Sequence, residues 1–138
     1  MPADPRLSVL KAPTIADIEA LAADAWASIP EEFRKRCNNL VIQVEDFPTD
    51  EALDALGIES PFDLMGLYQG VSLDRKSVMD AEPGQDLVYL YRRPMLDYWA
   101  EEDLTLGELV THVLIHEIGH HFGLSDEDME ALEASAGG

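Results

Sequence analysis

The spacing of apolar residues divides the first part of the chain into helical and extended segments. From Thr14 onward, apolar positions recur at helical intervals until Pro30 interrupts them, and a second short helix is expected over 30–39. The stretch "LVIQVEDF", at 40–47, alternates and is rich in β-branched residues, so it predicts a strand. Residues 48–57 open on a proline and a capping pattern and close on a glycine, which indicates a short helix.

The middle of the chain is expected to add further strands. Residues 63–73 are apolar but carry two glycines, which favours a strand with a turn or bulge near Gly70. A loop is expected over 75–85. The stretch "DLVYLYRRP", at 86–94, predicts a second clear strand that Pro94 ends.

The longest helix is expected towards the C-terminus. After a short helix predicted over 95–103, Thr105 and Glu108 form the pattern of a capping box, which begins the long helix. Gly123 fits the left-handed residue just past its end. The helix between them is apolar almost all round, which is typical of a helix in a core.

These elements predict one domain over 1–138, with a loose lead-in at 1–12. The expected fold class is α/β (α+β): a small mixed sheet of three to four strands, packed by helices, with the long histidine-bearing helix at the C-terminal end. A content of 46% apolar residues is enough to bury a core, so disorder is not expected.

The charge balance bears on partners. With 9 basic against 28 acidic residues, the formal charge is −19, which argues against nucleic acid and anionic membrane as partners. The sequence shows neither a signal-peptide core nor an apolar run of the ~20 residues that a membrane span needs, so a cytoplasmic location is expected. The single cysteine, Cys37, has no partner for a disulfide, and a structural or incidental thiol is the favoured interpretation.

The candidate chemistry lies in "HEIGHHFGLSD", at 116–126. His116 and His120 are four residues apart, about 40° in rotation and ~6 Å in rise, so both rings can reach one cation at zinc–nitrogen distances of ~2.0–2.1 Å. Glu117 falls beside the ion, where its carboxylate can accept a proton from a metal-bound water. The alternative is that both histidines are hydrogen-bonded core residues and that Glu117 pairs within the core.

Catalytic zinc uses three protein ligands, and one helix cannot easily supply all of them. Gly123 lets the chain turn, so Asp126 can swing back to the ion. A chance match to the motif with this extension is expected on the order of once in ten thousand. Alternatively, Asp126 is only the N-cap of a helix over 126–135.

Four neighbouring residues have more ordinary interpretations. His112 lies on the ligand face one turn before His116, but a supporting or core histidine is favoured over a fourth ligand. His121 points away and is expected at the surface. Arg92 and Arg93 could bind a substrate carboxylate, although pairing with the acidic surface is favoured.

The motif, together with the strands "GLYQGVSL" and "LVYLYRRP" before it, resembles the small bacterial zincin-like family of zinc metallopeptidases, metzincin-like in spacing, over roughly 40–129. The resemblance implies that Zn²⁺ is held by His116, His120 and Asp126, with Glu117 as general base. One departure concerns the end of the chain: 12 residues follow Asp126, so we expect neither a C-terminal subdomain nor a separate methionine turn, and Met129 is too near the motif to be that turn.

Two functions are therefore expected as alternatives. The first is a zinc-dependent peptidase that acts on a peptide or protein substrate, for which strand 86–92 is a candidate edge strand if it is not a central core strand. The second is a non-catalytic metal-binding or interaction domain that retains the helix. The sequence leaves the oligomeric state open.

Overall fold

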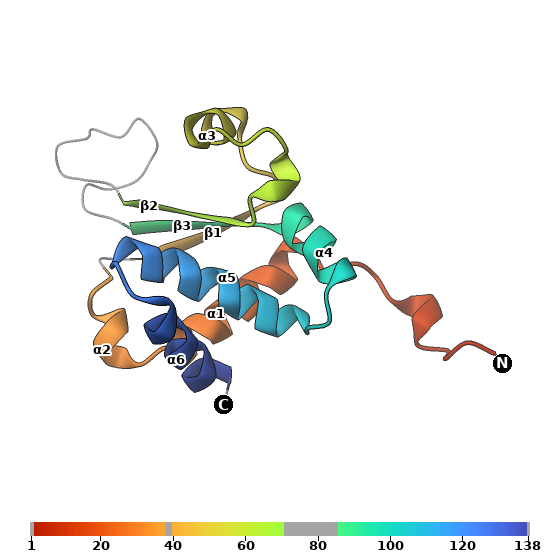
Figure 1. Cartoon of the computed structure of the whole chain (residues 1–138). Helices are drawn as coiled ribbons and strands as arrows, with labels where there is room; N and C mark the ends of the chain where they lie inside the picture. Colours follow the sequence, from red (N-terminus) through yellow and green to blue (C-terminus); the bar gives the residue numbers. More distant parts are fainter. Residues whose placement is uncertain (1, 38–39, 71–85, 138) are drawn as a thin grey trace.

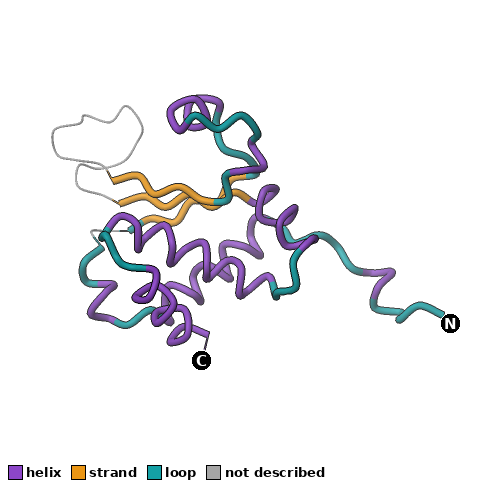
Figure 2. The backbone as a smooth tube through the Cα atoms, in the orientation of Figure 1, coloured by secondary structure: helices purple, strands orange, loops and turns teal. Residues whose placement is uncertain are grey.

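The computed structural model describes residues 2–37, 40–70 and 86–137 of the chain. The predicted turn near Gly70 and the loop over 75–85 lie mostly or wholly outside these ranges. The elements, traced in Figures 1 and 2, are the short 3₁₀ turns Leu7–Val9 and Pro61–Asp63; the helices α1 Ile15–Ser28, α2 Glu31–Arg34, α3 Asp50–Leu56, α4 Arg92–Glu101, α5 Leu106–His121 and α6 Asp126–Gly137; and the strands β1 Val41–Glu45, β2 Gly66–Gly70 and β3 Asp86–Tyr91.

The described strands form a mixed sheet in the order β1-β3-β2, with β1 parallel and β2 antiparallel to β3. The register places Val44 opposite Leu90 and Tyr68 opposite Val88, and Val44, Val88 and Leu90 are buried. Helices α1 and α5 pack on the sheet and on each other, and Figure 1 shows them with α6 on one side of the sheet and α3 on the other. The α+β class and the small mixed sheet are therefore confirmed.

The two ends of the long helix α5 have the capping features that the sequence predicted. Thr105 caps it: its side chain accepts from the Glu108 N–H, while the Glu108 carboxylate accepts from the Thr105 N–H. At the other end Gly123 adopts a left-handed φ of 66°, and the Leu124 N–H donates to the Gly119 carbonyl, which closes a Schellman turn. The helix body is a main part of the core through its buried residues Leu109, Val110, Val113, Leu114, Ile115 and Ile118.

The boundary between β3 and α4 differs from the prediction. The strand predicted over 86–94 ends at Tyr91, and helix α4 begins at Arg92 rather than at 95. Pro94 does not stop an element, because it lies in the first turn of α4, where a missing N–H breaks no intrahelical bond. Likewise α5 is not the last helix, since α6 follows it and packs back along it.

The first residues of the described chain have little regular structure. Residues 2–12 form only the turn Leu7–Val9, all are exposed to solvent, and in Figure 1 the segment projects away from the helices. It joins the fold through Pro13, whose carbonyl oxygen accepts a hydrogen bond from Arg92 Nε at 2.6 Å.

Candidate metal centre

The motif residues lie along the last turns of α5. His116 is partly buried, whereas His120 and His121 are exposed. The His116 and His120 rings lie 6.0 Å apart between centroids and are tilted by 64°. Burial lowers the pKa of His116, and the charge of His112 lowers it further, so the neutral imidazole that can ligate a metal is favoured.

Glu117 points from α5 towards β2. Its Oε1 accepts a hydrogen bond from the Tyr68 N–H at 3.1 Å. The close approach of helix and strand depends on Gly66, because a Cβ there would lie 2.7 Å from Val113 Cγ1 and 3.1 Å from Glu117 Cγ. Burial raises the pKa of Glu117, while the Tyr68 N–H and His120 lower it. A carboxylate whose pKa is moved upwards by burial is a better proton acceptor near neutral pH.

The hydrogen bond to Glu117 also shows which way β2 faces. The Tyr91 N–H donates to the Met65 carbonyl at 2.9 Å, so by antiparallel alternation the Tyr68 N–H points away from β3. Glu117 therefore lies along the open edge of the described sheet. Of the two interpretations left open for strand 86–92, the central strand is the one observed: β3 is central in the described sheet, and β2 is the edge beside the motif.

Asp126 is the first residue of α6 and is exposed. It does not cap that helix. Ser125 does so, since its Oγ accepts from the Asp128 N–H at 3.1 Å and its own N–H donates to the Asp128 carboxylate. The alternative role of Asp126 as an N-cap is therefore wrong. Asp126 is near enough to His116 for its charge to raise the pKa of that imidazole.

The tight group of metal-type donors that the described residues do form has other members. His112, His116 and Glu133 place one ligand atom each within 4.8 Å of one another, and His116, His120 and Asp126 do not form such a group in this structure. His112 is therefore not a core residue: it is exposed, and its Nδ1 faces Glu133. Glu133 escaped sequence inspection, although its place seven residues after Asp126, on the same face of a following helix, could have indicated it.

Helix α6 is held against the motif helix by Met129. This side chain is 1% exposed and packs on Gly119, where a Cβ would lie 2.7 Å from Met129 Cγ and closer still to Sδ. Met129 lies within α6, so it is not a methionine turn, as expected. It nevertheless fixes the distance between the two helices that carry the candidate ligands.

The remaining candidates are engaged elsewhere. His121 stacks on the Tyr68 ring at 4.0 Å between centroids. Arg92 pairs with Asp46 at 3.1 Å, which confirms the pairing interpretation for that residue. The partly buried Cys37 has a pKa raised by burial to about 11, which disfavours the reactive thiolate.

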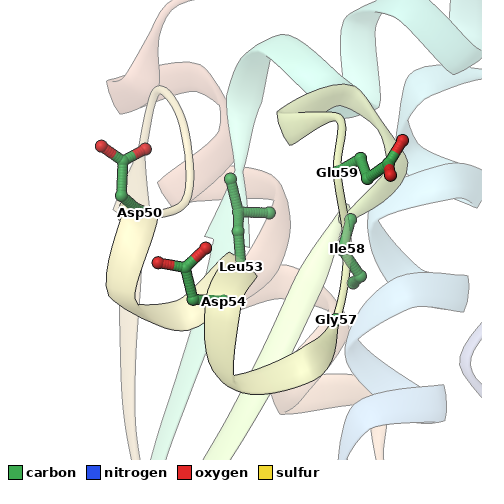
Figure 3. Close-up of a pocket in the computed structure, with 6 residues that line it drawn as sticks. All are labelled: Asp50, Leu53, Asp54, Gly57, Ile58 and Glu59. Carbon is green, nitrogen blue, oxygen red and sulfur yellow. The ribbon is translucent and has the colours of Figure 1, made fainter.

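A hollow of about 640 Å³ lies on the other side of the sheet, around α3. Figure 3 shows its lining: Asp50, Leu53, Asp54, Gly57, Ile58 and Glu59. None of these residues belongs to the motif or to α5 and α6, so this hollow is not part of the metal centre. In the described part of the chain, no helix combines the length and the apolarity that crossing a bilayer requires.

Comparison with known proteins agrees with this geometry. The family model for zincin-like metallopeptidases matches residues 37–136, which include the sheet, α5 and most of α6. The chain therefore belongs to the zincin-like metallopeptidase family, and the resemblance noted in the sequence is confirmed. No curated protein matches the chain.

The donors fit the zinc that this family implies. Imidazole nitrogens and carboxylate oxygens are the ordinary zinc ligands, and α5 and α6 bring both kinds together. The Glu133 Oε1 atom is buried, and among the described residues no hydrogen bond reaches it, so a cation beside it would satisfy an otherwise costly group.

Proposed function

We propose that this chain is a zinc-dependent peptidase in which His116, His120 and Asp126 hold the ion and Glu117 is the general base. The observation that carries the proposal is the position of Glu117. Its carboxylate is partly buried, adjoins the histidine pair in sequence, and lies at the open edge of β2 through the Tyr68 N–H. Asp126 supports it as well, because Ser125 has taken over the capping role that would otherwise explain that aspartate.

The substrate class follows from the edge strand. An extended peptide can add to an exposed strand edge by backbone hydrogen bonds. A peptide on β2 would run past Glu117, which already binds an outward-pointing N–H of that strand. Zinc supplies Lewis acidity, which makes a water molecule more acidic and a carbonyl more electrophilic. Glu117 accepts a proton at its carboxylate and donates it to the leaving amine.

The test is hydrolysis of an unstructured protein by the full chain. Activity should disappear on chelation and return with zinc. Glu117→Gln keeps the side chain's shape and can still accept the Tyr68 hydrogen bond, but it cannot take a proton, so we expect a fall in rate of about 10²–10⁴-fold with zinc binding retained. Glu130→Gln, an exposed change on α6, is the matched control for loss of one negative charge. Full activity in Glu117→Gln would remove that residue from the mechanism.

One observation favours the second candidate, a metal-binding domain without turnover. The tight donor group contains His112, and the residue after it is the buried Val113 rather than a base. If the chain is such a domain, the purified protein should bind zinc in the titration but should not hydrolyse unstructured protein. The same assay, run beside a zinc titration, therefore separates the two candidates.

A further inference from the structure

The tight donor group lies between α5 and α6, one turn back from the motif. His112 Nδ1 is 2.5 Å and His116 Nε2 is 3.4 Å from the same oxygen, Glu133 Oε1. The two imidazole rings lie 4.0 Å apart between centroids, so both face the same carboxylate from successive turns of α5.

This convergence follows from how the two helices pair. Gly119 contacts Met129 and His116 contacts Glu133, so α6 runs back along α5 in the opposite direction. Residues seven apart on a helix differ by only about 20° in direction. Glu133 therefore lies on the same face of α6 as Asp126, about two turns further along, at the level of His112 and His116.

The two imidazoles are ion-pair partners of the Glu133 oxygen only when they carry a proton, and no hydrogen bond reaches it among the described residues. It is buried, yet neither imidazole nitrogen reaches it with hydrogen-bond geometry. Leaving a buried carboxylate oxygen without a hydrogen bond is costly. Two nitrogens and one such oxygen that face a common point form the donor arrangement that a divalent cation completes.

One of the two nitrogen–oxygen distances already suits a zinc-class ion, and the other needs a small adjustment. Ligand bonds of about 2.0–2.1 Å in a tetrahedron give a ligand–ligand separation of about 3.3 Å. The 3.4 Å between His116 Nε2 and Glu133 Oε1 matches this edge, and the 2.5 Å pair needs to open by less than 1 Å. A hollow of about 340 Å³ adjoins the group at Glu133 and is lined by Thr105, Gly107, Glu108, Thr111 and Glu133.

We propose that His112, His116 and Glu133 form a second zinc-class site, which shares His116 with the predicted catalytic ligands. Because the shared nitrogen can bind one ion at a time, the two sites are mutually exclusive and the chain holds one zinc ion. Val113 stands where a base would be needed, so the second site binds metal without activating a nucleophile. The proposal concerns donor atoms alone and does not depend on peptidase activity.

Zinc titration of metal-stripped full chain by calorimetry tests this directly. His120→Ala removes a ligand from the motif set only, and we expect it to retain one zinc ion with Kd within about 10-fold of the unmodified chain. His112→Ala/His120→Ala damages both sets and should weaken binding by more than about 100-fold, beyond the loss that a supporting residue gives. His121→Ala, an imidazole outside both sets, is the control.

Glu133 is tested in the same background. Glu133→Gln combined with His120→Ala should lose zinc binding, whereas Glu130→Gln with His120→Ala should keep it. The proposal is overturned if His120→Ala alone falls to the affinity of the double histidine variant, if Glu133→Gln has no effect in that background, or if the unmodified chain binds two zinc ions. If the unmodified chain hydrolyses no unstructured protein while these titrations come out as expected, only the peptidase proposal is contradicted.

Discussion

Replacing Gly119 by alanine tests whether Met129 sets the spacing of the two ligand-bearing helices. A Cβ at 119 would lie 2.7 Å from Met129 Cγ, closer than real Cβ contacts come. Met129 is 1% exposed and its Cγ is near the backbone of α6, so the side chain has little room to retreat. Either Met129 leaves a good rotamer or α6 moves outward.

The size of the effect can be worked out from opposing contributions. Overpacking of a buried site costs about 1–3 kcal/mol. Alanine in a helix gains about 0.8–1.0 kcal/mol over glycine, which offsets part of this. A net loss of up to about 2 kcal/mol remains. For 138 residues the unfolding entropy is about 0.3 kcal/mol per degree, so Tm should fall by up to about 7 °C.

The matched control is Gly107→Ala in the same helix. There a Cβ meets Leu21 Cδ2 at 3.9 Å, an ordinary contact, so only the helix preference operates and Tm should rise by up to about 3 °C. Thermal unfolding of metal-free protein, followed by circular dichroism, measures both. In a double-mutant cycle, Met129→Ala should cost about 1–3 kcal/mol less in the Gly119→Ala background than alone. If Gly119→Ala were as stabilising as Gly107→Ala, the close packing of α6 on α5 would be refuted.

Three further outcomes are expected. Thr105→Ala removes the capping hydrogen bond of α5 and should lower stability by about 1 kcal/mol, measured by denaturant unfolding. Gly66→Ala should separate β2 from α5 by contact with Val113, costing about 1–3 kcal/mol and lowering any hydrolytic rate through displacement of Glu117. Replacing two carboxylates should change stability with opposite pH dependences. Burial raises the pKa of Glu117, so Glu117→Gln should stabilise metal-free protein at pH 7 but not below about pH 4.5. The Thr105 N–H lowers the pKa of Glu108, so Glu108→Gln should destabilise the protein at pH 7 and lose this effect as the pH falls through the lowered pKa. Equal pH profiles for the two variants would contradict at least one of the two assignments.

Most of the fold could be predicted because its signals are local. The cap at Thr105, the left-handed glycine at 123 and the alternation in 40–47 each depend on a few neighbouring residues, and each appears in the structure. The prediction that the strand extends to Pro94 was wrong because a proline alone does not say which element it belongs to. Proline is disfavoured in the interior of a strand or a helix but is allowed in the first turn of a helix. Only the start of α4 directly after Tyr91 decides between these positions.

The order of the strands in the sheet and the contacts between distant segments could not be predicted from the sequence. Nothing in "LVYLYRR" distinguishes a central strand from an edge strand, because both read as apolar runs, and the position of β3 depends on β1 and β2 pairing on either side of it. The role of Asp126 was ambiguous for a similar reason. Ser125 and Asp126 are both good caps, and only the hydrogen bonds of the folded turn assign the role to Ser125.

The pairing of α5 with α6 also limits where an ion can bind. Each step of four residues turns a helix by about 40°, so the three imidazoles at 112, 116 and 120 fan over about 80° and span ~12 Å of rise. One ion cannot be reached by all three. Asp126 and Glu133 are seven residues apart on α6 and therefore point in nearly the same direction. Each faces a different part of the row of histidines: Glu133 lies beside His112, and Asp126 lies nearer the other end. His116 lies between the two carboxylates. If Asp126 joins His116 in binding the ion, the ion lies beside Glu117; if Glu133 does so, the ion lies one turn away from Glu117.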